Sequence, residues 1–501
     1  MAQHSFDGYS QLPTNVAPPA FWRARGYASH YTRAAIQYAR NLRRSVALAL
    51  GGAFVLLVTV LALVGHKRAK GGAEEPPLLG GPPDWASVRA YEAALPQHNP
   101  NLTFPEGASG RYLKFTCEVQ ELGWNNALNE RLMNAHLAYA SKRAYVFQDY
   151  IWKREYYPWQ QPRFLVDPPH TPMNALVAGP AVGGEWDPDD PAPRAVSAAY
   201  WEEVCPPAER RVINTREVKE AQGHRWDDGD VIFRAWRALL LDAPERCVEI
   251  VSEDREKDGY PQVFDLFLWG SARILPLAAE FLRSPVSRLH ATSAPVAAAV
   301  ARNAPLFRAR ARGGPHDPFA RTLAMHIRRG DFKDACLGLA AWNSTFYSWN
   351  LLPELPDHFT AHAGGGWGWN TEENIALYLE HCLPTFDAIV QKTRDAKRDY
   401  LAEGQKKGEE RVLDVMYILT NDESAWLDEL KDALHKDGWT TIVTTKDLQF
   451  DQETMDVNMA VDMELARLAA VFIGNGWSSF TSNIVHRRLV DGREYISTRF
   501  F

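Results

Sequence analysis

The sequence lacks the short motifs that most often reveal an enzyme's chemistry. Its five cysteines include no C-x-x-C pair, which argues against a zinc ribbon or a thioredoxin-type site. H-E-x-x-H, G-x-S-x-G and Walker sequences are also absent, and we find no internal repeat. These absences leave the zinc-protease, α/β-hydrolase and P-loop signatures without support, so function has to be inferred from less familiar patterns.

The sequence also has only a small excess of one sign of charge. A formal net charge of −7 over 501 residues argues against broad nucleic-acid binding. An apolar content of 46% with 11% aromatic residues excludes a mainly disordered or fibrous chain, and the length exceeds that of one compact domain. The charge is uneven, because residues 1–44 contain six arginines and a single acid, Asp7. The acidic excess therefore lies in the remainder.

An uncharged run of 21 residues, Ser45–Gly65, separates these two parts. At about 1.5 Å rise per residue, a helix of this length spans roughly 30 Å, the thickness of the hydrocarbon core. A cleaved signal peptide has a much shorter charged region than the 44 residues that precede this run. More cations flank its amino side than its carboxyl side, which favours a cytosolic N-terminus. We predict a single-pass type II protein of the Golgi or endoplasmic reticulum membrane, with the C-terminal part lumenal.

Residues 66–105 are rich in glycine and proline and predict a flexible stem. Two N-glycosylation sequons, at Asn101 and Asn343, fit a lumenal location. The cysteines are compatible with one or two disulfides and a thiol left over, and their pairing cannot be deduced from the sequence.

Strands and helices alternate in two parts of the chain. Residues 111–149 have the pattern strand, loop, helix, strand, which is a βαβ unit. Residues 154–193 contain nine prolines and predict a long irregular insertion, which we place on the acceptor side. The alternation returns after residue 318, with strands predicted at 322–327, 412–420, 439–444 and 470–474 and helices at 372–394, 423–436, 457–470 and 479–488.

This alternation predicts an α/β protein with parallel sheets covered on both faces. We expect two Rossmann-like domains that face a cleft, preceded by a single transmembrane helix. The predicted divisions are a cytosolic tail (1–44), an anchor (45–65), a stem (66–105), an N-terminal Rossmann-like domain with the insertion (106–315) and a C-terminal Rossmann-like domain (316–501).

Two motifs stand where predicted strands end. The first is His326-Ile-Arg-Arg-Gly-Asp-Phe332, and adjacent arginines at such a position can bind a phosphate through bidentate hydrogen bonds. An alternative is an Arg–Asp pair that fixes the loop. The second is Phe472-Ile-Gly-Asn-Gly-Trp-Ser-Ser-Phe-Thr481, where glycines permit close approach and hydroxyls begin a helix. That pattern is typical of a phosphate site, although it also fits an ordinary serine N-cap.

Metal-binding patterns are weak. Asp187-Pro-Asp189 and Asp228-Gly-Asp230 imitate the Asp-x-Asp of metal-dependent nucleotide-sugar enzymes, but acidic turns are common and we interpret both as solvated loops. We therefore expect no metal site.

Together the motifs resemble the protein O-fucosyltransferase family, whose members transfer fucose from GDP-fucose within a two-domain GT-B fold. Arg328 matches the arginine of the family's His-Leu-Arg motif, which contacts the donor pyrophosphate and is essential. Residues 123–126 resemble the Gly-x-Asn-Gln loop, with Asn125 on the functional asparagine and Asn126 replacing the glutamine. Residues 472–481 are similar to the stretch that holds the donor phosphates.

The resemblance covers roughly residues 111–501 and implies roles for further positions. Asp462 precedes Phe472 by ten residues, as a nucleoside-contacting aspartate does in the family. Some members use a first-loop glutamate as a base, and Glu121 lies one position away from it. The implied catalytic residues are Arg328, Asn125 and Glu121, and the implied substrate-binding residues are Gly123, Asn126, His326, Asp462, Ser478, Ser479, Phe480 and Thr481.

The function that the resemblance implies is a membrane-anchored glycosyltransferase. It would transfer fucose from GDP-fucose to a hydroxyl of a protein or glycan acceptor, without a metal or another cofactor. Three alternatives stay open: another nucleotide-sugar-dependent GT-B transferase, a catalytically inactive sugar-binding membrane protein, and a membrane-anchored scaffold.

Overall fold

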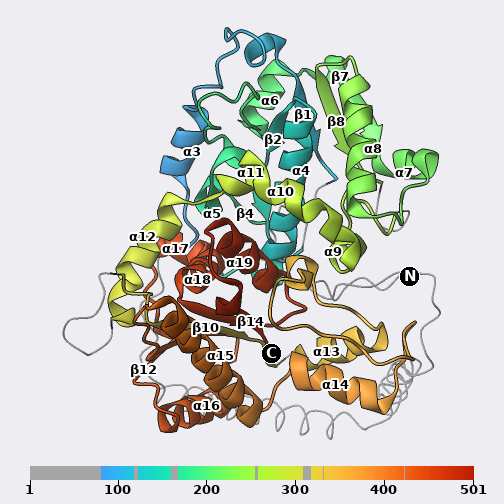
Figure 1. The fold of residues 1–501 in the computed structure, drawn as a ribbon. Helices are drawn as coiled ribbons and strands as arrows, with labels where there is room; N and C mark the ends of the chain where they lie inside the picture. The colour runs from blue at the N-terminus through green and yellow to red at the C-terminus, as the bar shows by residue number, and fades with distance from the viewer. Residues whose placement is uncertain are drawn as a thin grey trace, which may run out of the picture. The chain divides into compact units, whose positions relative to one another are not determined.

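The structure is a computed structural model of the chain. It describes residues 81–117, 122–159, 168–253, 258–308, 317–330, 332–422 and 424–501. Residues from Pro82 to Phe501 fall within one compact unit, drawn as the coloured ribbon in Figure 1. The predicted tail (1–44) and anchor (45–65) lie outside the described residues. Within the described part of the chain, no helix is long and apolar enough to cross a membrane.

A parallel sheet of five strands forms the centre of the N-terminal lobe, which we define as residues 82–308. Its order is β6-β2-β1-β8-β7, so β1 lies between β2 and β8. Every residue of β1 and β2 is buried, as expected for strands covered by helices on both faces. The strands are β1 (Tyr112–Phe115), β2 (Ala144–Phe147), β6 (Val196–Ser197), β7 (Arg210–Asn214) and β8 (Cys247–Val251).

Helix α4 (Trp124–Ala140) connects β1 to β2, which confirms the predicted βαβ unit. The other helices of the lobe are α3 (Ala86–Ala93), α5 (Met173–Leu176), α6 (Ala198–Val204), α7 (Thr215–Gln222), α8 (Gly229–Asp242), α9 (Leu266–Trp269), α10 (Ala278–Arg283), α11 (Pro285–Arg288) and α12 (Ala294–Asn303). The predicted irregular insertion contains short paired strands: β3 (Tyr150–Ile151) pairs with β4 (His170–Thr171), and β5 (Val177–Ala178) pairs with β9 (Ala291–Thr292).

A second parallel sheet of five strands forms the centre of the C-terminal lobe, which we define as residues 317–501. Its order, β12-β11-β10-β13-β14, is the 3-2-1-4-5 arrangement of dinucleotide-binding folds. The first strand, β10, pairs on one side with β11 and on the other with β13. The strands are β10 (Thr322–Ile327), β11 (Val415–Thr420), β12 (Thr441–Thr444), β13 (Val471–Gly474) and β14 (Thr498–Phe500).

The helices of this lobe are α13 (Phe332–Ala341), α14 (Glu372–Cys382), α15 (Phe386–Lys407), α16 (Ala425–Lys436), α17 (Gln452–Asp456), α18 (Asn458–Leu468) and α19 (Ser479–Val490). The prediction of one helix over 372–394 is wrong, because α14 ends before Pro384 and α15 begins after it. Proline has no N–H for a helical hydrogen bond, and the Thr385 hydroxyl then accepts from the Ala388 N–H to cap the new helix.

The two lobes share one hydrophobic core, which includes Phe115 of the first sheet and Phe472 of the second. Helices α18 and α19 of the C-terminal lobe pack against α12 and α4 of the N-terminal lobe (Figure 1). The two Rossmann-like sheets are therefore lobes of one compact unit, and the predicted cleft between them stays a prediction.

A fully buried arginine stabilises a helix end in each lobe. Arg143 donates to the carbonyls of Ala243 (2.8 Å) and Leu240 (3.1 Å) at the end of α8. Arg488 donates to the carbonyls of Ala469 (2.6 Å) and Arg467 (3.1 Å) at the end of α18. Burial lowers the pKa of both guanidinium groups to about 9. Both remain cations at neutral pH, where the negative end of a helix dipole favours them.

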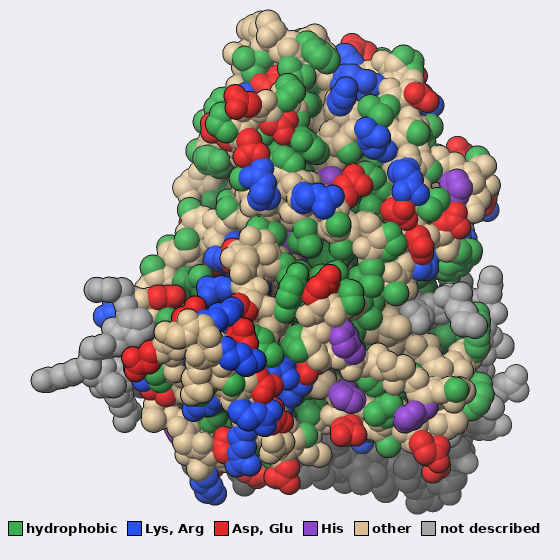
Figure 2. All heavy atoms as spheres, viewed as in Figure 1, with side chains coloured by type: hydrophobic (Ala, Val, Ile, Leu, Met, Phe, Trp, Pro, Cys, Tyr) green, Lys and Arg blue, Asp and Glu red, His purple; other side chains and the backbone are tan. Residues whose placement is uncertain are grey.

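Charged side chains of both signs are interspersed on the face shown in Figure 2. Helix α15 gives two examples: Arg394 lies 2.5 Å from Asp437, and Arg398 lies 2.6 Å from Asp395. Exposed pairs of this kind contribute little to stability individually, but they balance the local charge.

Two disulfides connect neighbouring elements, Cys205 with Cys247 and Cys336 with Cys382. The second joins α13 to the end of α14. Cys117, directly after β1, is buried and belongs to neither bridge. The structure thus has the two disulfides and one remaining thiol that the sequence allowed, with a pairing that the sequence could not give.

The stem was predicted to run to residue 105, but folded structure begins before that residue. Residues 86–93 form α3, and the Trp85 side chain before it is 3% exposed. The indole N–H of Trp85 donates to the Asp456 carboxylate of α17 (3.2 Å), which also accepts from Trp159 Nε1 (3.1 Å) and Thr171 Oγ1 (2.7 Å). One buried carboxylate therefore binds three segments of the N-terminal lobe, and glycine and proline content alone gave no sign of it.

We expect Asp456→Asn to lower the free energy of unfolding by about 1–3 kcal/mol, because an amide leaves at least one buried donor without an acceptor. Urea denaturation measures this change. Glu453→Gln on the same helix is the matched control and should change stability by less than about 0.5 kcal/mol. Equal effects of the two substitutions would contradict the role given to Asp456.

Candidate functional site

The predicted donor motifs meet at the carboxyl edge of the C-terminal sheet. Strand β10 ends at Ile327 and β13 ends at Gly474, and the strand order reverses between them. In open α/β sheets, ligands bind at this switch point. His326 Nδ1 lies 3.2 Å from Thr481 Oγ1, and the His326 ring centre lies 4.7 Å from that of Phe480. The structure therefore brings the two motifs into contact.

His326 is neutral at physiological pH. Burial, and to a smaller extent the nearby charge of Arg328, lower its pKa to about 3. A neutral imidazole has one donor and one acceptor nitrogen, and one of the two faces the Thr481 hydroxyl. The predicted role of Thr481 in binding phosphate stays a prediction, and its hydroxyl, which has one donor and two acceptor positions, uses one of them toward His326.

The adjacent arginines after β10 have different environments. Arg329 donates to the Pro384 carbonyl, and its guanidinium carbon lies 4.0 Å from the centre of the Trp426 ring. Arg328 is half-buried and lies 4.5 Å from the centre of the Phe332 ring, at the start of α13. Arg329 therefore has a structural role, and Arg328 is the candidate for binding a ligand at the switch point. The alternative Arg–Asp pair involves Asp331, which lies outside the described residues.

Two glycines allow the loop after β13 to pack closely. A Cβ atom on Gly474 would lie 2.2 Å from Thr481 Cγ2, and one on Gly476 would lie 2.3 Å from the Phe346 ring. The Gly476 carbonyl accepts from the Tyr347 N–H (2.8 Å) and from Asn350 Nδ2 (2.9 Å). These contacts fix the loop from its carbonyl side, so they determine where α19 begins.

The first turn of α19 contains the predicted hydroxyls. Ser478 is its N-cap residue but makes no side-chain capping hydrogen bond, and Ser478 and Ser479 are each 2% exposed. The first N–H groups of a helix lack acceptors within the helix, and together with the helix dipole they favour an anion. The start of α19 thus has the properties of an anion site, at the switch point and in the lobe that carries Arg328.

The first loop of the N-terminal lobe contacts this helix directly. Asn483 Nδ2 of α19 donates to the backbone oxygen (2.9 Å) and side-chain oxygen (3.1 Å) of Asn125. The Tyr347 hydroxyl donates to Asn126 Oδ1 (3.0 Å). Asn126 Nδ2 and Asn483 Oδ1 are buried, and neither has a hydrogen-bond partner among the residues that the structure describes. Gly123 precedes α4, and a Cβ atom there would have open space. The loop therefore places polar amides next to α19.

Sequence reasoning missed Asn483 and Tyr347. Asn483 follows Ser479 by four residues, so helical spacing places both on one face of α19 and could have indicated it. Tyr347 lies in an irregular segment between α13 and α14, and no pattern in the sequence marks it.

Asp462 lies in a separate polar group on α18. Its carboxylate accepts from the Tyr417 hydroxyl of β11 (2.5 Å) and from Thr445 Oγ1 after β12 (3.0 Å). Burial raises its pKa to about 6. A carboxyl group with a raised pKa at such a position is a candidate for ligand recognition.

Glu121, the candidate base, lies outside the described residues, so its role stays a prediction.

Acidic side chains do not gather into a metal site in the described part of the chain, where no group of three His, Cys, Asp or Glu residues could hold an ion. The acidic pairs considered from the sequence contain ion-paired members: Asp187 pairs with Arg288, and Asp230 lies 2.6 Å from Arg234. Whether the reaction needs a metal stays a prediction.

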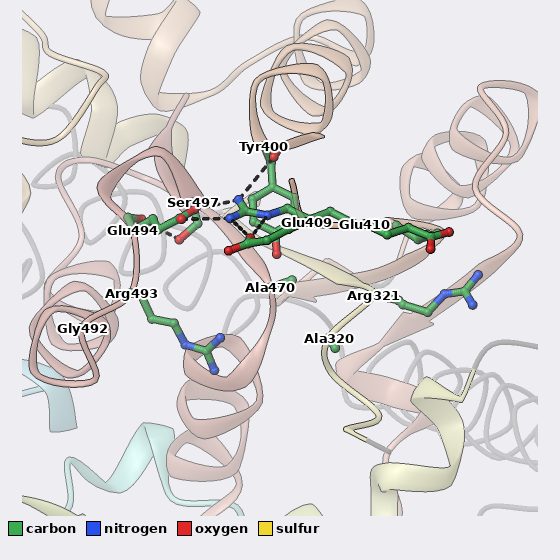
Figure 3. Close-up of a pocket in the computed structure, with 12 residues that line it drawn as sticks. Ala320, Arg321, Tyr400, Glu409, Glu410, Ala470, Gly492, Arg493, Glu494 and Ser497 are labelled. Atoms are coloured by element: carbon green, nitrogen blue, oxygen red, sulfur yellow. Dashed lines mark hydrogen bonds and ion pairs between the residues drawn. The ribbon is translucent and has the colours of Figure 1, made fainter. Parts of the chain in front are cut away.

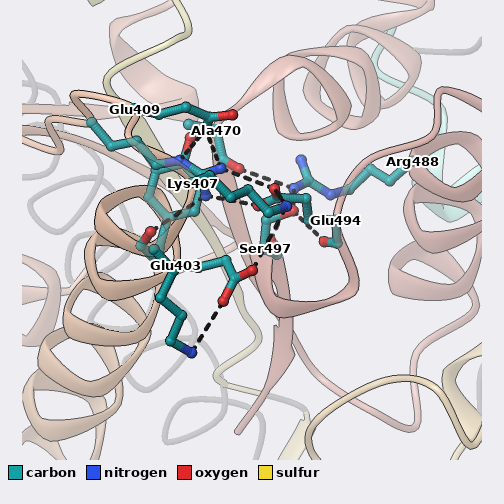
Figure 4. A network of polar contacts seen from close by, with 10 residues as sticks. Glu403, Lys407, Glu409, Ala470, Arg488, Glu494 and Ser497 are labelled. Carbon is teal, nitrogen blue, oxygen red and sulfur yellow. Dashed lines mark hydrogen bonds and ion pairs between the residues drawn. The ribbon is translucent and has the colours of Figure 1, made fainter.

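A hollow of about 670 Å³ opens on the opposite, amino edge of the C-terminal sheet (Figure 3). Its charged residues pair with one another or with near neighbours. Arg321 pairs with Asp414, and Arg411 lies 2.7 Å from Glu494, which Lys407 also contacts (Figure 4). Because these charges are neutralised and the carboxyl edge lies across the sheet, we assign this hollow no part in the chemistry.

No family model and no curated protein matches the chain. Among solved structures, POFUT1 in complex with GDP-fucose is similar with a TM-score of 0.45 and 14% identity, covering 78% of this chain and 98% of that one. NodZ alpha-1,6-fucosyltransferase soaked with GDP-fucose has a TM-score of 0.34 and 10% identity, covering 76% and 92%. A mutant of Arabidopsis thaliana FUT1 in complex with GDP has a TM-score of 0.32 and 10% identity, covering 80% and 73%.

The raised pKa of Asp462 predicts a pH dependence of stability. The unfolded carboxyl titrates near pH 4, so between about pH 4 and 6 the folded chain binds a proton that the unfolded chain does not. The stability that this group contributes is complete below pH 4 and decreases as the pH rises through 6. Asp462→Asn should remove this decrease from a series of urea unfolding curves between pH 4 and 7.

Glu494 provides a control of opposite sign. Hydrogen bonds from Arg411 lower its pKa to about 2, so its contribution is present above pH 4.5 and is lost as the pH falls toward 2. Glu494→Gln should remove the fall in stability below pH 4.5 and lower stability by a constant amount from pH 4.5 to 7, without changing the slope in that range. If Asp462→Asn leaves the dependence of the unfolding free energy on pH the same as in the native chain, the Asp462 carboxyl titrates normally.

Proposed function

We propose that the chain is a glycosyltransferase that uses a GDP-sugar, with GDP-fucose as the donor and a hydroxyl of a protein or glycan as the acceptor. The observation that carries this proposal is the contact of His326 on β10 with Thr481 of α19 at the switch point of the C-terminal sheet, together with the contact of Asn483 on α19 with the Asn125 loop. Arg328 follows His326 by two residues, and we place it at the same point. A cation and a helix N-terminus at such a point suit a pyrophosphate. The fucose specificity rests on the resemblance of the motifs to the protein O-fucosyltransferases.

Departure of GDP creates negative charge on the pyrophosphate, and the site is equipped to stabilise it. Arg328 presents a planar guanidinium that can bind two phosphate oxygens at once. The hydroxyls of Ser478 and Ser479 and the N–H of Ser479 would supply further donors, since the Ser478 N–H donates to the Asn475 carbonyl (3.1 Å). Groups that are fixed before the reaction stabilise the transition state most, because no reorganisation is needed. The contacts of Gly474 and Gly476 fix this segment.

The remaining residues would orient the two substrates. Neutral His326 and the adjacent Phe480 ring would contact the nucleoside part of the donor, and Asp462 would accept hydrogen bonds from it. Asn125 and Asn126 would position the transferred sugar or the acceptor from the other lobe. The acceptor hydroxyl must lose a proton, and we propose Glu121 as the base.

We also propose that this part of the chain lies in the lumen of the Golgi or endoplasmic reticulum. The charge around Ser45–Gly65 supports a type II orientation. The two disulfides support it too, since such bridges persist in oxidising compartments and are rare in the cytosol.

Arg328→Lys should lower turnover by roughly 100- to 1000-fold, because lysine keeps the charge but cannot hold two phosphate oxygens in one plane. The affinity for GDP should fall less than turnover, since the lost interaction is strongest in the transition state. Release of GDP from GDP-fucose and calorimetric binding of GDP measure the two effects, with thermal melts to verify folding.

Arg329→Lys is the matched control, because that side chain contacts Pro384 and Trp426 instead of the switch point. It should retain turnover and change only stability. A folded Arg328→Lys protein with near-normal turnover would contradict the proposed mechanism.

Protease added to intact microsomes should remove the N-terminal tail and leave the folded lobes intact, because Ser45–Gly65 is the membrane-length run. Antibodies against the two ends of the chain would follow both parts. Detergent permeabilisation is the control that exposes both. Digestion of residues 111–501 in sealed vesicles would refute the lumenal orientation.

A further inference from the structure

Three aromatic rings from separate segments meet at the carboxyl edge of the N-terminal sheet. Trp226 follows α7, Tyr260 follows β8, and Phe267 lies in α9. The ring centres of Tyr260 and Phe267 are 4.5 Å apart, and Trp226 lies 5.4 Å from Tyr260 and 6.4 Å from Phe267. The Trp226 side chain is 46% exposed, which is unusual for so large an apolar surface. We refer to these three residues as the aromatic platform.

A guanidinium group lies on this platform without a hydrogen-bond partner. The Arg225 guanidinium carbon is 3.8 Å from the centre of the Tyr260 ring and 5.3 Å from that of Trp226. Its Nε is buried, and within the described residues it has no hydrogen-bond partner. A buried donor without a partner carries a cost, which a ligand or an ordered water relieves.

The surrounding contacts hold the platform in place before any ligand arrives. Arg273 donates to the backbone carbonyls of Arg225 (3.2 Å) and Asp227 (3.0 Å), and Asp227 also lies 2.7 Å from His224 Nδ1. The buried Lys219 ammonium donates to the carbonyls of Tyr260 and Gln262. A preorganised surface of this kind loses little conformational entropy on binding.

The platform lies on the same edge of the sheet as the Asn125 loop. Strand β8 pairs with β1, whose carboxyl end leads to that loop, and the platform segments follow β7 and β8. Directly after α9, the Gly270 carbonyl accepts from Thr345 Oγ1 of the C-terminal lobe (3.3 Å), and Trp269 and Trp349 have ring centres 5.8 Å apart. In Figure 1, α9 lies between the upper lobe and the orange segments of the lower one. The platform is therefore adjacent to the junction where we place the reaction.

We propose that Trp226, Tyr260 and Arg225 form a binding subsite for a pyranose sugar of the acceptor, an inference that rests on the proposed transferase function. The exposed indole offers a flat surface for the apolar C–H face of the ring. Arg225 donates to sugar oxygens, and the carboxylates of Asp227 and Asp228 accept from hydroxyls. Donors and acceptors alone would also suit a peptide, but an exposed flat ring beside them suits a pyranose, which has an apolar C–H face bordered by hydroxyls that both donate and accept. The acceptor is accordingly a glycan.

The test is saturation-transfer NMR on the full-length chain in a zwitterionic detergent, which carries no sugar headgroup. The probes are the methyl β-glycosides of glucose, galactose, xylose and N-acetylglucosamine. The native chain should transfer saturation to ring protons of at least one glycoside. Trp226→Ala and Arg225→Gln should each weaken that binding by about tenfold, since stacking and a charge-assisted hydrogen bond are lost.

Trp369→Ala is the matched control, because Trp369 is 60% exposed in the C-terminal lobe and should not affect the transfer. GDP affinity should be the same in all three variants. The subsite is refuted if no glycoside receives saturation from the native chain, or if all three variants lose it equally. If the native chain transfers saturation to a glycoside but does not bind GDP, it binds a sugar without being the proposed transferase. That result would overturn both the proposed function and the role of the subsite in holding the acceptor.

Discussion

The position of helix α19 depends on the absence of a side chain at Gly474. Thr481 occupies the space that a Cβ atom would need, and this close approach lets its hydroxyl reach His326 on the neighbouring strand. Two residues further along, Asn483 reaches Asn125 of the other lobe. The close contact between Gly474 and Thr481 thus positions the start of α19 against both His326 and the first loop of the N-terminal lobe. A larger residue at 474 would displace the helix start, the imidazole and the first loop together.

The alternation of strands and helices was predictable because the central parallel strands are buried on both faces and are therefore continuously apolar. Strands β1, β2, β10, β11 and β13 all overlap their predicted ranges. The break between α14 and α15 was missed, although Pro384 marks it, because helical periodicity on both sides outweighed one residue. The elements between 194 and 317 were missed because most are short and carry little periodic signal.

Contacts between distant segments were beyond prediction from one sequence. Trp85 and Asp456 are 371 positions apart, and neither has a local pattern that indicates the other. For the site, sequence reasoning identified the strand ends, because functional residues of this fold class follow the central strands. The resemblance singled out Arg328 over Arg329, but the contacts of Arg329 could not be foreseen, since the Pro384 carbonyl and the Trp426 ring come from later elements. Glu121 stays a prediction because it lies outside the described residues.

The buried polar groups of this chain are satisfied unevenly. Arg143 and Arg488 are buried deep in the lobes, and each donates to several backbone carbonyls. At the junction of the lobes, Asn126 Nδ2 and Asn483 Oδ1 are buried and have no hydrogen-bond partner among the described residues, and the same holds for Trp201 Nε1 and Trp439 Nε1 away from the junction. Each such atom costs about 1–3 kcal/mol, which a fold tolerates where a ligand or water completes the hydrogen bonds. A donor and an acceptor left open beside α19 suit the hydroxyl groups of a sugar, which form both kinds of hydrogen bond. The junction therefore combines fixed backbone geometry with unfilled hydrogen-bonding capacity.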